Sequence, residues 1–395
     1  MSVGGQAILE GVMMRSPHSL AIAVRRPGGE IVVKEDAWQS IWERARFLRK
    51  PFLRGAVVLF ESLYNGMQAL SFSADQAARF APEEAGTAGH AGQPRPTPGD
   101  PAAKATATTG AAATIEPPPL SGWAIAGTMA LAMAFGFGLF AALPHFLTWL
   151  AGVATGNASL ASGKDLGFQL VDGLLKVIFL VGYMAAISRL PDIARVFQYH
   201  GAEHKSIWCY EDGRALTVEN ARSYTTLHPR CGTSFLLITV VTSILLFSVV
   251  FPQLPDVSDR KWLNQLAYVF IKVPLMFPVA GLAYEATRLS ARFPRNPIVR
   301  LFTWPGLMLQ HITTKEPDDS QLEIALVALQ MTLRREEILR REEVPRHDKV
   351  LLRDLTRSDV AGTGAAPVEP AVYASYAAFL EHVRADVAPP VPLAA

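Results

Sequence analysis

The sequence has few charged residues and only two cysteines. Charged side chains make up 18% of its 395 residues, and half of the residues are hydrophobic, whereas a soluble domain carries about 25% charged residues. The formal net charge of +2 argues against a nucleic-acid partner. Cys209 and Cys231 are too few for the disulfide framework of a small secreted domain. The composition therefore predicts a protein whose partner is the lipid bilayer.

The scarcity of charge is concentrated in a few long stretches. No Asp, Glu, Lys or Arg occurs in the 47 residues between Glu116 and Lys164, and about 20 apolar residues suffice for a helix to span a bilayer. Three later stretches have a similar length and hydrophobicity. We therefore expect transmembrane helices at Trp123–Leu147, Leu166–Ser188, Cys231–Pro255 and Trp262–Thr287.

The distribution of basic residues predicts the orientation of these helices. Residues 1–122 contain 12 Lys and Arg, residues 189–230 contain six and residues 288–395 contain 14, whereas the two remaining loops contain one and two. Because loops rich in Lys and Arg stay in the cytoplasm, we expect both termini to be cytoplasmic. The N-terminus shows no basic segment followed by an apolar core, so we expect no cleaved signal peptide.

Three segments outside the expected spans have a readable local structure. Pro51–Ala74 is apolar but contains charged residues, so we expect an interfacial or re-entrant amphipathic helix, with a fifth span as the alternative. Residues 19–34 predict a β-hairpin, because two β-prone segments flank the turn residues Pro27–Gly29. Leucines at helical spacing predict an amphipathic helix over residues 318–340.

Composition divides the chain into seven regions. Thirty of the 39 residues in 81–119 are Ala, Pro, Gly or Thr, which predicts a disordered linker. The fold class is a mainly α membrane protein with about four transmembrane helices and a small cytoplasmic α+β part at the N-terminus. The regions are the N-terminal region (1–80), the linker (81–119), a first transmembrane pair (120–188), a cytoplasmic loop (189–230), a second transmembrane pair (231–288), an amphipathic-helix region (289–345) and a weakly ordered tail (346–395).

The cytoplasmic loop contains residues that suggest metal chemistry. We expect a helix of about 20 residues between Pro191, typical of a helix start, and Gly213, typical of a helix end. His200 and His204 lie one turn apart on its apolar face, so both imidazoles can reach one ion. With Glu203 between them they form the pattern H-x-x-E-H, in which two histidines bind zinc and the glutamate polarises water.

Three further residues are candidate ligands of a divalent, zinc-like ion. His228 and Cys231 follow His204 by 24 and 27 residues, and zinc sites combine Cys with His. Glu285 is expected at the inner end of the fourth span, on the same side as the histidines. The alternative is that the histidines are hydrogen-bonded core residues, Cys231 a small buried residue and Glu285 an ordinary interfacial carboxylate.

Charged residues inside the expected spans form a second candidate site. Asp172 and Lys176 lie four residues apart in the second span, and Lys272 lies in the fourth. Charged groups at membrane depth are costly and are candidates for function. The alternative is an ion pair within one helix whose lysine reaches toward the membrane surface. Lys272 either pairs with Asp172 across helices or also reaches toward the surface.

Four motifs occur together in this chain: Gly4–Ala7 with Glu10–Arg15, Tyr199–Lys205, His228–Thr233 and Thr313–Asp319. Their combination resembles the YqhQ-like family of bacterial membrane proteins, whose function is unknown and which are often described as predicted metal-dependent enzymes. The resemblance covers about residues 1–80 and 165–335. It implies a multi-pass protein of the bacterial inner membrane.

Two functions are left open by these observations. The first is a metal-dependent hydrolase with its site at the cytoplasmic face of the membrane. Its residues would be the ligands His200 and His204, the general base Glu203, and a further ligand from His228, Cys231 or Glu285. The second is a non-catalytic membrane scaffold, or a carrier of a lipid or small solute, in which Asp172, Lys176 and Lys272 matter more.

Overall fold

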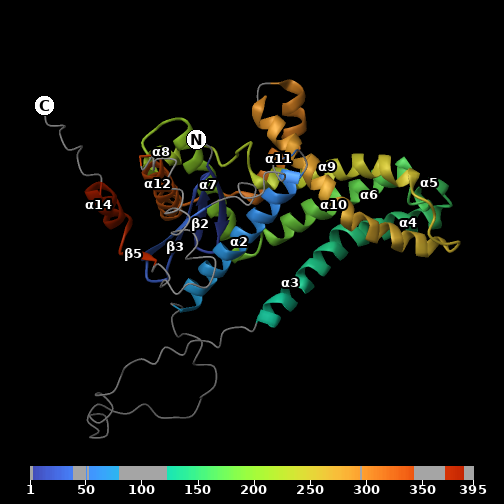
Figure 1. The fold of residues 1–395 in the computed structure, drawn as a ribbon, viewed down its shortest axis with the longest axis horizontal. Coiled ribbons are helices and arrows are strands. Elements are labelled where there is room, and N and C mark those ends of the chain that lie inside the picture. The colour runs from blue at the N-terminus through green and yellow to red at the C-terminus, as the bar shows by residue number, and fades with distance from the viewer. Residues whose placement is uncertain are drawn as a thin grey trace, which may run out of the picture.

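The computed structural model of the protein describes residues 3–38, 50, 53–79, 122–293, 296–341 and 370–386. A small sheet with its covering helices lies at one end, and the long apolar helices extend from it toward the other (Figure 1). The predicted linker, residues 81–119, lies outside the described residues.

The described residues contain one antiparallel sheet with the strand order β1-β2-β3-β4-β5. Arg25 pairs with Ile31 across the predicted hairpin, which is therefore confirmed. The tail was predicted to be weakly ordered, and this is corrected for residues 370–386, which supply the last strand and a helix. The strands are β1 (Gly4–Ile8), β2 (Gly11–Arg15), β3 (Ser19–Arg25), β4 (Ile31–Ala37) and β5 (Ala371–Tyr373).

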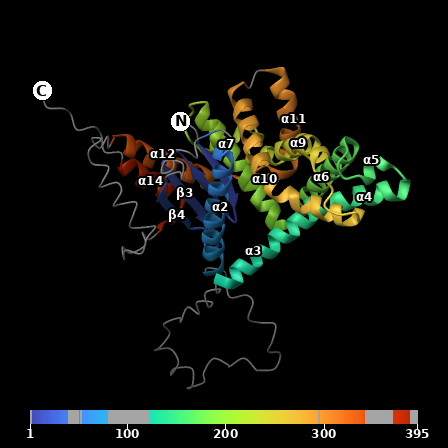
Figure 2. The same ribbon diagram turned by 45° about the vertical axis from the view of Figure 1, so that its right-hand side comes forward.

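Helices cover both faces of this sheet. On one face Val12, Ala23 and Val33 belong to a core that includes residues of α7 (Pro191–Glu211) and α12 (Asp319–Arg341). On the other face the side chains of the alternate strand positions form a cluster with Ala69 of α2 (Leu53–Arg79), and Figure 2 shows this helix beside the sheet. Strands buried on both faces need apolar residues at consecutive positions, which explains the continuous apolar segment of β3.

Within the described residues, four helices are long and apolar enough to span a bilayer: Gly127–Thr155, Leu166–Ile187, Gly232–Gln253 and Lys261–Leu289. The four expected spans are therefore confirmed, although the first ends eight residues later than Leu147, because the uncharged stretch continues there. The elements are α3 (Gly122–Phe137), a π-helical turn (Gly138–Ala142), α4 (Leu143–Thr155), α5 (Ala158–Ala161), α6 (Leu166–Ile187), α9 (Gly232–Val250) and α10 (Lys261–Arg292).

Helix α2 connects the two ends of the molecule and is not one of those four helices. Its polar residues Glu61 and Asn65 are buried, whereas Phe60 and Leu63 are more than half exposed. It packs along α10 and against the sheet (Figure 2). A helix that turns polar residues inward and apolar residues outward has the arrangement expected of the predicted interfacial helix.

The remaining helices surround the sheet end of the bundle. The predicted amphipathic helix is present as α12, and α8 (Val218–Arg222) packs against it. Helix α11 (Pro297–Thr313) packs along α9. In the tail, Phe379 of α14 (Tyr376–Asp386) is fully buried and meets Tyr373 of β5 edge to face, with 5.3 Å between ring centroids. This aromatic contact is what anchors the tail.

Candidate metal centre

The centre is built on α7, which begins at Pro191 and ends at Glu211, as the sequence predicts. Gly213 follows with a φ of 70°, the left-handed conformation that commonly ends a helix. The side chains from Tyr199 to Ile207 are buried except that of His200, which is partly buried. The middle of the helix is therefore inserted into the core, and its polar side chains need partners there.

Two histidines of α7 meet one cysteine from the start of α9. The Nε2 atom of His200 lies 3.1 Å from the Sγ atom of Cys231. Donor atoms of His200, His204 and Cys231 all lie within 4.8 Å of one another, and the two imidazole rings are 4.5 Å apart between centroids. Among the described residues, these three form a group that could hold a metal ion.

Backbone carbonyls fix the orientation of both imidazoles. The Nδ1–H of His200 donates to the carbonyl of Thr313 over 2.8 Å, and the Nδ1–H of His204 donates to the carbonyl of Thr226. With the proton held on Nδ1, the lone pair of each Nε2 is available as a ligand. This is the arrangement in which metal-binding histidines are held by a second layer of hydrogen bonds.

Cys231 is the N-cap residue of α9, and its Sγ accepts the backbone N–H of Thr233 over 3.4 Å. It is buried and not in a disulfide. Cys209 is also buried, but its Sγ contacts the carbonyl of Ala215 instead. The two cysteines of the chain therefore lie in different environments, and one of them faces the histidines.

Glu203 lies beside the histidines but faces β1. The backbone N–H of Gly5 donates to its carboxylate. Burial raises the pKa of Glu203, while the imidazoles of His200 and His228 act in the opposite direction. The carboxylate is not one of the grouped ligand atoms. It is instead a buried acid next to them, as the H-x-x-E-H pattern requires of a base.

His228 is packed against the centre but is turned away from it. Its ring lies 5.5 Å from that of His204 and 4.8 Å from that of Trp208 between centroids. Its Nδ1 accepts the backbone N–H of Arg230 over 3.3 Å, so its Nε2 carries the hydrogen and faces Glu211 at 3.6 Å. Burial lowers the pKa of His228 to about 4.

Glu285 is not brought to the centre. Its two carboxylate oxygens accept hydrogen bonds from the guanidinium of Arg54, at 2.6 and 2.5 Å. The structure thus groups Cys231 with the two histidines of α7 and leaves both His228 and Glu285 outside the group. Glu285 joins α2 to α10 instead.

Several residues that hold the centre lie in the motifs Tyr199–Lys205 and Thr313–Asp319, but the sequence does not show which contacts they make. A Cβ on Gly201 would lie 2.1 Å from the backbone oxygen of Lys315, so the loop after α11 packs directly on α7. Lys205 of α7 forms an ion pair with Glu316 of the same loop. The motif Thr313–Asp319 marks this loop in the sequence, but only the fold shows that it supplies a carbonyl to His200.

A polar cavity of about 490 Å³ lies on the Glu203 side of the centre. Gly5, which contacts Glu203, and Arg230, which precedes Cys231, are both in its wall. The wall also contains the buried amide of Asn65, whose Nδ2 has no hydrogen-bond partner in the described part of the chain. His200, Glu203, His204 and Cys231 are not among the residues that line this cavity, which approaches the centre through Gly5 and Arg230.

The fold and the centre together define a membrane protein with four candidate spans and a His–His–Cys cluster at the sheet end of the bundle. The chain belongs to the family described as "Protein of unknown function (DUF1385)", which it matches over residues 50–335. It is 32% identical to "Uncharacterized protein YqhQ" of Bacillus subtilis (strain 168) over 341 residues, which cover 85% of this chain and 93% of that protein. The resemblance to the YqhQ-like family is thereby confirmed. No solved structure matches the chain.

Proposed function

We propose that the protein is a metal-dependent hydrolase of the bacterial inner membrane, with its site at the cytoplasmic face. The observation that carries the proposal is the convergence of donor atoms from His200, His204 and Cys231 within 4.8 Å of one another. The histidines lie in α7 and Cys231 is the N-cap residue of α9, 31 residues after His200. The buried carboxylate of Glu203 lies beside the histidines.

The donor set fits a zinc-like ion. Imidazole and thiolate ligands suit zinc, and the ligand atoms around one tetrahedral zinc lie about 3.4 to 3.6 Å apart. The separation of 3.1 Å between His200 Nε2 and Cys231 Sγ is near this range, and the wider separations in the group, up to 4.8 Å, would have to shorten around the ion. Three protein ligands leave a fourth position for water or substrate, which is typical of catalytic rather than structural zinc.

The chain itself would supply binding and proton transfer. When bound, the ion supplies Lewis acidity. Glu203 would take up and return the proton at its carboxylate, because burial already raises its pKa toward neutrality. The Gly5 N–H would keep that carboxylate in place. Arg230, in the wall of the cavity, would orient a polar substrate toward Cys231.

The placement at the cytoplasmic face is supported by the basic residues. The centre is formed by residues 189–230 and the start of α9, and the six Lys and Arg of that loop favour the cytoplasm. The N-terminal region, whose sheet packs on α7, contains 12 further Lys and Arg. We therefore expect sheet, centre and both termini on one side of the bilayer.

The test is the metal content of protein purified in detergent without chelator. Wild type should contain about one zinc-like ion per chain, and His200→Ala, His204→Ala and Cys231→Ser should each lose most of it. Cys209→Ser is the matched control and should retain the ion, because Cys209 lies elsewhere. Glu203→Gln should retain the ion and lose hydrolysis of p-nitrophenyl acetate, bis-p-nitrophenyl phosphate or labelled casein, whichever the wild type cleaves.

Two results would overturn the proposal. The metal site would be ruled out if wild type contains well below one ion per chain and the three ligand variants contain the same amount. Normal hydrolysis by Glu203→Gln would remove its role as base. In the first case the histidines are core residues, and a scaffold or carrier becomes the better interpretation.

A further inference from the structure

The spans contain a buried cluster of charges. The Oδ2 atom of Asp172 in α6 accepts hydrogen bonds from Lys176 Nζ at 2.7 Å and from Lys272 Nζ of α10 at 2.8 Å. The exposed fractions of the three residues are 1%, 7% and 2%. The alternative interpretation of the sequence required Lys176 to reach toward the membrane surface, and its buried ammonium group does not do so. The charges are held between helices.

The hydrogen bonds around His145 show that it adds no charge to the cluster. The side-chain Nε2 of Gln265 donates to the carbonyl of Ala161. The other atom of this amide, Oε1 of Gln265, therefore accepts a hydrogen bond from the Nε2–H of His145 at 3.0 Å. The Nδ1 of His145 then accepts from Lys272 Nζ at 2.9 Å. His145 is thus a neutral imidazole, and two ammonium groups share the single carboxylate of Asp172.

Aromatic rings surround the two ammonium groups. Lys176 Nζ lies 5.5 Å and Lys272 Nζ 5.7 Å from the ring centroid of Phe247. Lys272 Nζ also lies within 6 Å of the rings of Phe168 and Phe251. Such contacts stabilise charged rather than neutral amines. With both amines protonated, the cluster carries one more positive than negative charge, in a region where an unpaired charge is costly.

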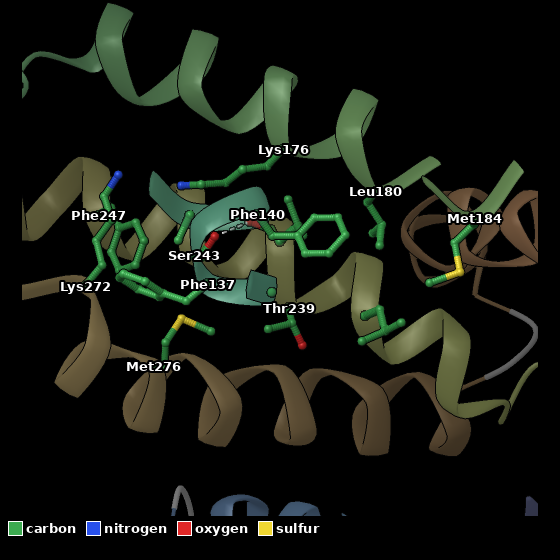
Figure 3. A pocket seen from close by; sticks show the side chains of 14 residues that line it. Phe137, Phe140, Lys176, Leu180, Met184, Thr239, Ser243, Phe247, Lys272 and Met276 are labelled. Carbon is green, nitrogen blue, oxygen red and sulfur yellow. Dashed lines mark hydrogen bonds between the residues drawn. The ribbon is translucent and has the colours of Figure 1, made fainter. Parts of the chain in front are cut away.

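The two lysines form one end of an apolar cavity of about 410 Å³ (Figure 3). Lys176, Lys272 and Phe247 lie together at that end, and Leu180 and Met184 lie toward the other. The wall of the cavity is almost entirely apolar, and Lys176 and Lys272 are the charged residues among those that line it. Its volume is within the range of sites that bind small ligands, about 300 to 1,000 Å³.

The first span is irregular where it borders this cavity. The π-helical turn Gly138–Ala142 precedes Pro144, which lacks a backbone N–H, and Phe140 of the turn lines the cavity. Such turns occur frequently at functional sites. One turn earlier, Gly136 also lines the cavity, and a Cβ built there meets nothing within 4 Å. The wall is therefore not closely packed at this point.

We propose that this cavity binds a long-chain carboxylate taken from the membrane. Its carboxylate would lie between Lys176 and Lys272, and its single chain would follow the apolar wall toward Met184. One negative charge matches the excess charge of the cluster, and both ammonium groups are hydrogen-bond donors to it. A single chain matches a cavity of this shape and size. The proposal goes beyond the metal centre and does not depend on it.

The test measures binding of radiolabelled stearate to the full chain purified in detergent and exchanged into neutral-lipid nanodiscs. Octadecanol, which has the same chain without the charge, is the competitor. The difference between octadecanol and unlabelled stearate measures what the carboxylate contributes to binding. Lys272→Met removes the ammonium group, and Lys261→Met, at the exposed start of the same helix, is its control. Gly136→Leu fills the cavity and leaves the charges in place. Its control is Gly182→Leu in α6, which also has free space around the added side chain.

We expect saturable binding of stearate, with octadecanol competing about tenfold or more weakly than unlabelled stearate. Lys272→Met and Gly136→Leu should each weaken binding about tenfold or more, and both controls should stay within about twofold of wild type. If Lys272→Met fails to fold, Gly136→Leu decides. Equal competition by octadecanol, wild-type binding in Gly136→Leu, or absence of saturable binding would each overturn the proposal. Native mass spectrometry would also overturn the proposal if it finds a diacyl phospholipid bound to the wild type and lost from Gly136→Leu.

Discussion

The carboxylate of Glu203 lies directly against the backbone of Gly5. The N–H of Gly5 donates to it, and a Cβ on Gly5 would lie 2.8 Å from its Cγ, Cδ and Oε1 atoms. This contact joins the Gly-Gly segment at the N-terminus to the H-x-x-E-H helix. It brings a strand at the edge of the sheet into contact with the middle of α7.

Gly5→Ala is therefore expected to displace the Glu203 carboxylate. The added Cβ must push away the group that Gly5 holds, so any hydrolytic activity of the wild type should fall about tenfold or more, with metal content retained. Gly4→Ala is the matched control, since a Cβ at Gly4 meets nothing within 4 Å. Equal activity in the two variants, measured with the substrate that wild type cleaves, would contradict this account of the contact.

A substitution at Gly201 should act on stability. A Cβ there would lie 2.1 Å from the backbone oxygen of Lys315, and forced overpacking costs about 1–3 kcal/mol. Gly201→Ala should lower the thermal unfolding temperature and release part of the metal, because the same loop supplies a carbonyl to His200. Gly182→Ala, also within a helix but in open space, should be neutral or slightly stabilising. The two unfolding curves, measured side by side, decide the matter.

Glu285→Gln should leave the metal content unchanged. Its carboxylate is held by Arg54 rather than by the metal centre. The change should instead weaken the contact between α2 and α10, with an effect of about 0–1 kcal/mol for a partly exposed pair. The metal content of Glu285→Gln is measured alongside those of wild type and His200→Ala. A loss of metal as large as in His200→Ala would restore Glu285 as a ligand.

The stability of the metal-free protein should fall as the pH decreases from about 6.5 to about 4. Burial lowers the pKa of His228 from 6.5 to about 4, so in this range the unfolded chain binds a proton that the folded chain does not. The contribution is complete above pH 6.5, and its loss amounts to about 3 kcal/mol. Chemical unfolding of chelator-treated protein at several pH values measures it. His228→Gln should show a flatter pH dependence, and a slope identical to wild type would assign the effect to other groups.

Topology reporters test the expected orientation. Fusions at Gly213 and after Ala395 should report the cytoplasm, and a fusion at Gly156 should report the opposite side, because the loops rich in Lys and Arg are retained in the cytoplasm. Gly156 lies at the end of the first span and Gly213 beyond the second. The same signal from Gly156 and Gly213 would contradict the arrangement of the spans.

The sequence by itself determined the elements whose signals are local. A span needs only an apolar stretch of sufficient length with few charged residues, and this predicted all four. The hairpin around Pro27–Gly29 and the helix from Pro191 followed from turn residues and from the spacing of apolar side chains. The one-turn separation of His200 and His204 is likewise a property of any helix. The tail was missed because β5 has three residues and pairs with a strand more than 300 residues away.

Only the tertiary structure decided which side chains complete the site. Cys231, His228 and Glu285 were alternative further ligands in the sequence; the start of α9 places Cys231 beside His200, while Arg54 holds Glu285 elsewhere. The carbonyl that orients His200 comes from a residue 113 positions away, and a carbonyl carries no side-chain signal. Lys176 and Lys272 share one carboxylate for the same reason. Contacts between distant segments depend on how whole helices pack, and no local pattern encodes that.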